Sequence, residues 1–190
     1  RRRRAGKSGS LVMPLADFRR YYAGDAAQLW ERQSLARARV VRGDPEFAAE
    51  VADDVREGVL GRPWSPDRID EVRSMRERLE ATAPPRSLKR GRGGMTDVEF
   101  LVQAFQLRHG REAPDVCRPN TWDSLDALLA AGLLSKEDHA TLTGGYSFLR
   151  LAEARLRIVT NRPLTEYPEA PDELEKLARR MGLASGAFFH

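Results

Sequence analysis

The fold class is decided by residues 88–109, which read LKRGRGGMTDVEFLVQAFQLRH. Residues 89–94 contain only lysine, arginine and glycine, a composition typical of a loop. Thr96 and Glu99 have the spacing of a capping box, in which a hydroxyl and a carboxylate accept hydrogen bonds from the free backbone N–H groups of a helix start. The stretch therefore predicts a loop followed by a helix that ends near His109. The residues expected to face inward are Val98, Leu101, Val102 and Phe105.

Helical signals extend over most of the remaining chain. Helices are predicted over residues 16–22, 25–41, from Asp44-Pro45, from Ser65-Pro66, from Thr121 to Gly132, from Ser135 to about Thr160, and over 171–181. Expected buried stripes are Phe47, Val51, Val55 and Val59, and Leu142, Tyr146, Leu149, Ala152, Leu156 and Val159. No segment shows sustained polar–apolar alternation. We expect an all-α bundle of about seven or eight helices over residues 15–190, preceded by a short strand remnant at residues 11–13.

The charge balance argues against a nucleic-acid-binding body. The 190 residues carry 32 Lys and Arg against 28 Asp and Glu, a net charge of +4. Arg1 to Arg4 and Lys7 supply five of these positive charges, and without them the balance is 27 against 28, or −1. A nearly neutral body makes nucleic acid an unlikely partner. The basic run itself is more typical of a solvated tail.

Other function classes are excluded by composition. Cys117 is the single cysteine, so an internal disulfide is impossible, and a reducing cytoplasmic location is expected. No stretch has the roughly 18 apolar residues of a membrane helix. Gly6-Lys7-Ser8 lacks the preceding glycine of a phosphate-binding loop. No catalytic residues and no metal-ligand spacing emerge, so we expect no catalytic centre and no metal site in this chain.

Three stretches remain open to more than one interpretation. In the loop, Lys89, Arg90, Gly91, Gly93 and Gly94 could form an anion site with backbone N–H groups at a helix start. A tight glycine turn that lets helices pack closely is equally consistent with this sequence.

The following helix carries a polar stripe of Glu99, Gln103 and Gln106. It is either a partner-binding face or, more commonly, a solvated one. In an earlier helix, Trp30, Glu31, Arg37 and Arg39 could form an interdomain polar network or ordinary surface pairs.

Three stretches together resemble one enzyme family. Residues 1–12 are similar to its R-L-R-P-x-G-x-S-G-x-L-V segment, although Arg2 and Arg4 replace Leu and Pro. Residues 30–41 resemble W-E-x-Q-A-L-x-R-A-R, and residues 88–103 resemble L-K-x-G-x-G-G-I-x-D-I-E-F-L-V-Q. The family is that of the bifunctional glutamine synthetase adenylyltransferase and adenylyl-removing enzymes.

The resemblance implies a piece of a tandem nucleotidyltransferase that uses ATP and Mg²⁺ to attach AMP to a tyrosine of glutamine synthetase, and removes it again. Glutamine and the PII signalling protein would set the balance. Residues 1–14 would be the C-terminal edge of a nucleotidyltransferase domain, and residues 15–190 a helical domain similar to that of PII uridylyltransferase. The family's Gly-Ser-Asp-x-Asp metal motif does not occur in this sequence. The chain alone is therefore expected to be inactive and to hold neither Mg²⁺ nor ATP.

The resemblance also implies roles for individual residues. Arg1, Arg3 and Lys7 would lie at the edge of the nucleotide-binding domain. The loop of residues 89–94 would join helices at a domain interface, which Asp97, Glu99 and Gln103 would face. The alternative is a non-enzymatic helical interaction module whose basic tail binds RNA or an acidic partner. The PII uridylyltransferase itself is disfavoured, because no His-Asp pair of a metal-dependent phosphohydrolase is evident.

Overall fold

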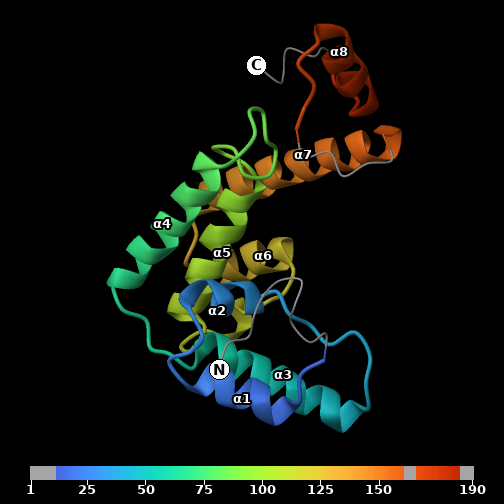
Figure 1. Ribbon diagram of the computed structural model, residues 1–190. Coiled ribbons are helices and arrows are strands. Elements are labelled where there is room, and N and C mark those ends of the chain that lie inside the picture. Colours follow the sequence, from blue (N-terminus) through green and yellow to red (C-terminus); the bar gives the residue numbers. More distant parts are fainter. Residues whose placement is uncertain (1–11, 161–165, 185–190) are drawn as a thin grey trace. The chain divides into compact units, whose positions relative to one another are not determined.

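The computed structural model describes residues 12–160 and 166–184. Over these residues the chain forms eight α-helices and one short 3₁₀ helix, with no sheet (Figure 1). They are α1 (Leu15–Ala23), α2 (Leu29–Leu35), α3 (Pro45–Leu60), α4 (Asp67–Ala81), α5 (Met95–His109), η1 (Pro114–Val116), α6 (Thr121–Ala130), α7 (Lys136–Thr160) and α8 (Pro171–Arg180). The predicted all-α class is confirmed. The predicted strand at 11–13 begins outside the described residues, and Val12 and Met13 have no regular secondary structure.

The described chain divides into two compact units. The first unit contains residues 12–73 and 102–133, and the second contains residues 74–101, 134–160 and 166–184. Helices α4 and α5 each contribute residues to both units. The domain boundary expected after residue 14 stays a prediction.

In the first unit, α1 and α2 pack against α3 (Figure 1). Arg19 of α1 binds Asp54 and Glu50 of α3 at 2.8 and 2.5 Å. The apolar core consists of Tyr22, Ala27, Leu29, Leu35, Val59, Leu60, Val72, Val102, Ala104, Leu107, Val116, Leu125 and Leu128. The stripe predicted along α3 is wrong at its start. Phe47 is 51% exposed, whereas the buried residues of α3 lie in its last turn, where Tyr22 and Leu35 are close to Gly58.

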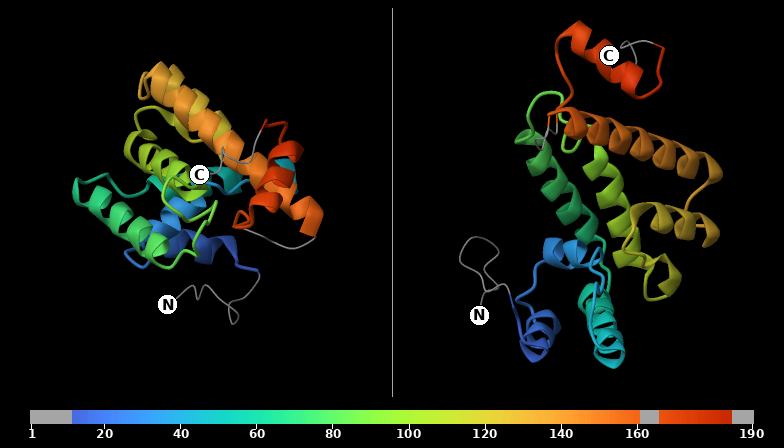
Figure 2. Two further views of the ribbon diagram at one scale, coloured as in Figure 1. Left: turned by 90° about the horizontal axis from the view of Figure 1, so that it is seen from above. Right: turned by 90° about the vertical axis from the view of Figure 1, so that its right-hand side faces the viewer.

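In the second unit, α8 packs on the long helix α7 (Figure 2). Leu174, Leu177 and Ala178 are buried on one face of α8, and Ala152 and Leu156 are buried on α7. The stripe predicted on α7 ends early, because Val159 is 51% exposed at the last turn of the helix. Arg86 and Ser87 lie beside the segment after α7, where Tyr167 N–H donates to the Arg86 carbonyl at 3.2 Å.

Polar side chains accept hydrogen bonds from the free backbone N–H groups at several helix starts. The Asp44 carboxylate accepts from the N–H groups of Glu46 and Phe47 at 3.0 and 3.2 Å, and the cap predicted at Ser135 also forms. The prediction that Asp25 begins α2 is wrong. Gln28 and Glu31 form a capping box there, and Asp25 binds Arg62 instead. Helix α2 ends at Leu35, well before residue 41.

Candidate functional site

The glycine-rich loop folds back on itself through backbone hydrogen bonds. Gly91 N–H donates to the Ser87 carbonyl at 3.1 Å, and Gly94 N–H donates to Gly91 at 2.9 Å. The N–H groups of Met95 and Thr96 donate to the carbonyls of Leu88 and Lys89 at 3.0 and 2.9 Å. These bonds build the loop directly onto the start of α5, which begins at Met95 and not at Thr96.

The glycines are required by close backbone packing. A Cβ atom on Gly94 would lie 2.8 Å from the carbonyl oxygens of Gly91 and Lys89, and 3.0 Å from that of Leu88. A Cβ atom on Gly91 would lie 2.6 Å from the Ser87 oxygen. Gly93 has a φ of 72°, a conformation that side-chain-bearing residues adopt only with strain. No larger residue fits at position 94 without moving the loop.

The buried side chain of Arg76, on α4, fastens the loop. Its guanidinium makes a bidentate contact with the Asp97 carboxylate, with Nη2 to Oδ2 at 2.9 Å. The same Nη2 donates to the Gly91 carbonyl at 2.9 Å. Gly93 N–H donates to Asp97 Oδ2 at 2.7 Å. Arg76 therefore ties α4, the loop and the first turn of α5 together, since planar guanidinium geometry suits a carboxylate.

This geometry bears on the two interpretations of the loop. An anion site needs unoccupied N–H groups, and those of Gly91, Gly93 and Gly94 already have acceptors within the loop or on Asp97. The geometry thus favours the tight turn. The side chains of Lys89 and Arg92 are exposed and that of Arg90 is half-buried, so a positively charged surface remains. Anion binding at this surface stays a prediction.

The polar stripe of α5 is buried, which overturns its interpretation as a solvated face. Glu99 is 9% exposed, Gln103 6% and Gln106 1%, whereas Leu101, expected inside, is 37% exposed. The Tyr146 hydroxyl of α7 donates to Glu99 Oε1 at 2.9 Å. Polar groups are stable in the interior when such partners are present, and this is why the stripe faces inward.

Gln106 organises the end of α5. Its amide nitrogen donates to the carbonyls of Val116 and Arg118 at 3.0 and 2.8 Å, and lies 2.9 Å from the Ser124 hydroxyl. Cys117, in the same segment, is half-buried, and burial raises the pKa of its thiol. The thiol is therefore held in its neutral form at physiological pH.

Sequence reasoning missed Arg32, which is 1% exposed. Its guanidinium donates to the Gly58 carbonyl at 2.6 Å and the Tyr22 carbonyl at 2.5 Å, and lies 5.7 Å from the centre of the Tyr22 ring. Burial lowers the pKa of this arginine. No signal in the sequence marks Arg32 as buried, because its carbonyl partners belong to other helices.

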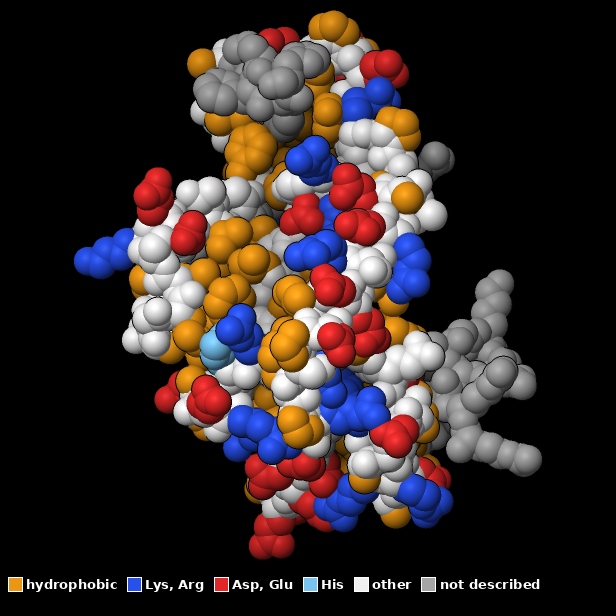
Figure 3. Space-filling view, turned by 90° about the vertical axis from the view of Figure 1, so that its left-hand side faces the viewer, with side chains coloured by type: hydrophobic (Ala, Val, Ile, Leu, Met, Phe, Trp, Pro, Cys, Tyr) orange, Lys and Arg blue, Asp and Glu red, His pale blue; other side chains and the backbone are white. Residues whose placement is uncertain are grey.

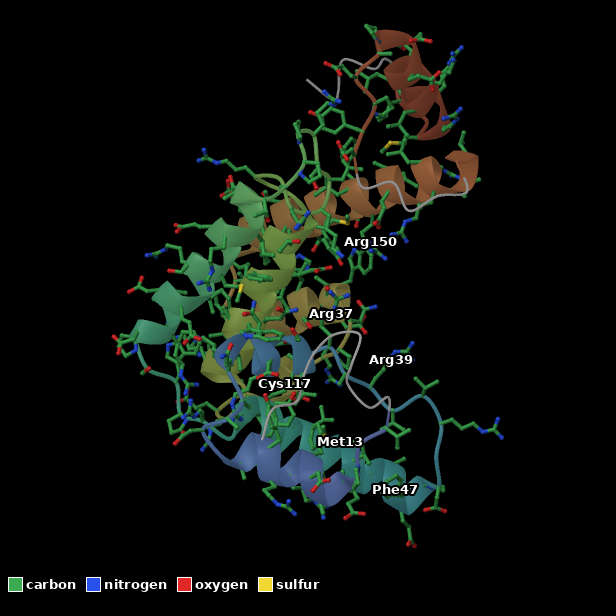
Figure 4. The ribbon with its side chains drawn as sticks, viewed as in Figure 1. Met13, Arg37, Arg39, Phe47, Cys117 and Arg150 are labelled. Carbon is green, nitrogen blue, oxygen red and sulfur yellow. The ribbon has the colours of Figure 1, made fainter. Side chains whose placement is uncertain are left out.

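The other expected site residues are distributed as follows. Arg1, Arg3 and Lys7 lie outside the described residues. Glu31 is buried and accepts from the Tyr21 hydroxyl at 2.6 Å, whereas Arg37 and Arg39 are exposed after α2 (Figure 4). Trp30 is half-buried. The structure therefore separates the four residues of that helix into buried and exposed groups.

Two general features bear on function. Within the described part of the chain, no group of three His, Cys, Asp or Glu side chains could hold a metal ion. None of the described helices combines the length and apolar composition that crossing a membrane requires. Basic and acidic side chains are interspersed on the face drawn in Figure 3, so no large field of one sign covers that face.

Comparison with known proteins gives two family matches. Residues 1–54 match the model of glutamate-ammonia ligase adenylyltransferase, and residues 67–188 match that of GlnD PII-uridylyltransferase. Relatives named bifunctional glutamine synthetase adenylyltransferase/adenylyl-removing enzyme include one from Nocardia farcinica, 40% identical over 172 residues, and one from Streptomyces coelicolor, 37% identical over 182. The alignments cover 88% and 94% of this chain but only 17% and 18% of those proteins.

The two matches are compatible. The first covers α1, α2 and the start of α3, and the second begins with α4 and includes the glycine-rich loop. The chain spans less than one fifth of the length of these curated relatives. It belongs to the family of bifunctional glutamine synthetase adenylyltransferase/adenylyl-removing enzymes, and its residues 67–188 match a helical segment also found in PII-uridylyltransferase.

Proposed function

We propose that this chain is the helical part of a longer protein that attaches AMP to glutamine synthetase and removes it again, on a tyrosine of that enzyme. The relatives' names support this activity, since they describe both an adenylyltransferase and an adenylyl-removing enzyme. In this proposal, residues 1–14 complete the nucleotidyltransferase domain and residues 15–190 form the helical domain. Arg1, Arg3 and Lys7 lie at the edge of the nucleotide-binding domain.

The reacting groups are assigned to another part of the longer protein. Two-metal phosphoryl transfer needs carboxylates that hold Mg²⁺ against the triphosphate, and the described residues offer no such group. In this proposal Mg²⁺ and ATP bind to that other part, and the 190-residue chain alone is inactive. Regulation by glutamine and the PII protein, in the cytoplasm, is part of the same proposal.

The observation that carries the helical domain's role is the fastened loop. Arg76 and Asp97 hold residues 87–97 in one conformation. A loop held this way can present Lys89, Arg90 and Arg92 to a neighbouring domain without losing conformational entropy at each contact. The loop acts as a rigid contact that positions the nucleotidyltransferase domain, and not as a nucleotide site.

Transfer of radiolabelled AMP to purified glutamine synthetase tests whether the reacting groups lie outside this chain. The full-length protein is expected to label glutamine synthetase in the presence of Mg²⁺ and ATP. The 190-residue chain, shown by circular dichroism to be helical, is expected to give only background. AMP transfer by the 190-residue chain would contradict the proposal.

The loop's role is tested by the double substitution Lys89→Ala/Arg90→Ala in the full-length protein. AMP transfer, or its response to glutamine, should fall about thirtyfold, because two charged contacts of about 1 kcal/mol each are lost. Arg73→Ala is the matched control, since Arg73 is exposed and pairs only with Asp70 on its own helix. If the melting temperature falls together with the activity, the substitution has damaged the fold. If the activity is unchanged, the two side chains make no contact that the reaction needs. Either result would contradict the proposed role of the loop.

A further inference from the structure

Part of the segment that follows α2, residues 39–42, has no backbone hydrogen bond to the described residues. After the turn at Ala36, residues 39–41 have no regular secondary structure, and the chain bends at Arg42. Ala38 N–H donates to Leu35 at 2.8 Å, but within the described chain the N–H and carbonyl groups of residues 39–42 make no hydrogen bond. Val40 is 37% exposed and Val41 82%. An exposed apolar segment with open backbone groups has the character of a strand edge.

An apolar groove of about 880 Å³ lies between this segment and α3 (Figure 4). The segment supplies one wall, and Phe47, Val51, Val55 and Val59 of α3 line another. Leu35 and Cys117 also line the groove. All of these residues belong to the first compact unit. The exposed Phe47, which breaks the stripe predicted for α3, is therefore part of an apolar surface and not an isolated side chain.

The charges around the groove are all of one sign. Arg39, Arg42 and Arg56 line it, and no aspartate or glutamate does. Two acidic residues of α3, Glu50 and Asp54, bind Arg19 of α1, and Asp53 pairs with Arg56 at 3.9 Å, which leaves Arg39 and Arg42 as the groove arginines without an acidic partner in α3. The groove therefore favours a partner with an apolar middle and acidic flanks.

We propose that residues 39–42 are the edge to which an extended strand from the preceding, nucleotidyltransferase part of the longer protein adds, with its apolar side chains in the groove and Asp or Glu near Arg39 and Arg42. Backbone groups give such strand addition its affinity, and alternate side chains give it specificity. The inference rests on the proposed function only for the source of the strand.

The residues that line the groove indicate which part of the longer protein supplies the strand. Its lining residues fall almost entirely between residues 18 and 60, and the adenylyltransferase family model matches residues 1–54. The relatives of that family are more than five times longer than this chain. A second copy of the chain fits less well, because antiparallel pairing of two 39–42 segments would place Arg39 opposite Arg42, and like charges across a strand pair are destabilising.

Hydrogen–deuterium exchange followed by mass spectrometry tests the proposal. Amides of residues 39–42 should exchange at least about tenfold more slowly in the full-length protein than in the 190-residue chain, because paired amides exchange only when the strand opens. Val41→Asp should restore fast exchange in the full-length protein. Val41→Thr is the matched control, since it is also β-branched and retains the slow rate.

Three outcomes would overturn the proposal. Fast exchange in both proteins would show that no strand adds, and equal protection in both would assign the pairing to this chain's own residues. Protection that rises with protein concentration, together with a dimer in sedimentation, would assign it to a second copy. The result is independent of the AMP-transfer assay, so failure of the proposed activity and failure of the strand pairing are distinguishable.

Discussion

Each compact unit contains a buried arginine, and the two guanidinium groups have different hydrogen-bond partners. Arg32 of the first unit donates to backbone carbonyls, those of Tyr22 and Gly58 at 2.5 and 2.6 Å and that of Gly24 at 3.4 Å. Arg76 of the second unit donates to one carbonyl and to the Asp97 carboxylate, and its Nη1 lies 3.4 Å from Glu80 Oε2. The first arginine joins the ends of two helices, and the second fastens a loop to a helix start.

The difference lies in how each buried charge is compensated. Arg76 has a carboxylate in direct contact, whereas Arg32 relies on carbonyl dipoles and the Tyr22 ring, and burial lowers its pKa. Each arginine also has one buried nitrogen without a hydrogen-bond partner among the described residues, Nε of Arg32 and Nη1 of Arg76. Such a charge is retained because removing it would leave buried carbonyls without donors. The first unit should therefore be the more sensitive of the two to loss of its arginine.

The largest expected effect is that of Arg32→Met, which keeps the apolar stem and removes every donor. The free energy of unfolding should fall by about 3 kcal/mol, since each of two buried carbonyls left unpaired costs roughly 1–3 kcal/mol. Urea unfolding followed by tryptophan fluorescence measures it. Arg20→Met, at an exposed position of α1, is the control. A loss below about 1 kcal/mol would show that the carbonyls find other donors.

The next largest effect is expected for Gly94→Ala in the loop. Its Cβ atom would meet three carbonyl oxygens at 3.0 Å or less, so the loop must shift and the unfolding free energy should fall by about 2 kcal/mol. Gly144→Ala is the matched control, because nothing lies within 4 Å of that Cβ position in α7. There the same change should stabilise by about 0.5–1 kcal/mol, through helix propensity. Equal effects at the two positions would contradict the packing argument.

The smallest effect is expected for Asp97→Asn, which keeps an acceptor for Gly93 N–H but removes the charge facing Arg76. The Asp97 side chain is 35% exposed, so solvent screening limits the loss to about 1 kcal/mol. Asp70→Asn, in an exposed pair with Arg73, should change stability by less than about 0.5 kcal/mol. If Asp97→Asn lowers the free energy of unfolding as much as Arg32→Met does, the two buried charges are compensated to a similar extent, and the contrast between the two units is wrong.

Local signals in the sequence predicted the fold class and several helix starts well. Asp44 and Ser135 cap their helices as expected, because a capping side chain needs only its neighbours in the chain. The face of α5 could not be predicted in this way. Glu99 is buried because Tyr146, 47 residues later, donates to it, and periodicity alone does not reveal such a partner.

The candidate site was predicted in part. The glycines of residues 91–94 do form a tight turn, since their crowding follows from local geometry. The contact with Arg76 was not foreseen, because Arg76 lies in a different helix and resembles any surface arginine in sequence. Arg32 was also missed, because it too resembles a surface arginine in the sequence and its partners lie in other helices. The helix predicted to run to Val41 ends at Leu35. The predicted helix is too long, because Arg and Ala are good helix formers and the competing β-branched signal of Val40 and Val41 is short.

The segment between the two family matches, residues 55–66, is held by an arginine from each side. Arg32, within the first match, donates to Gly58, and Arg111, within the second, donates to the Leu60 carbonyl at 2.7 Å. A chain cut at this junction would therefore lose the donor for one of these two carbonyls, and a buried carbonyl without a donor is destabilising. The boundary between the two family matches is thus not a boundary between independently stable pieces.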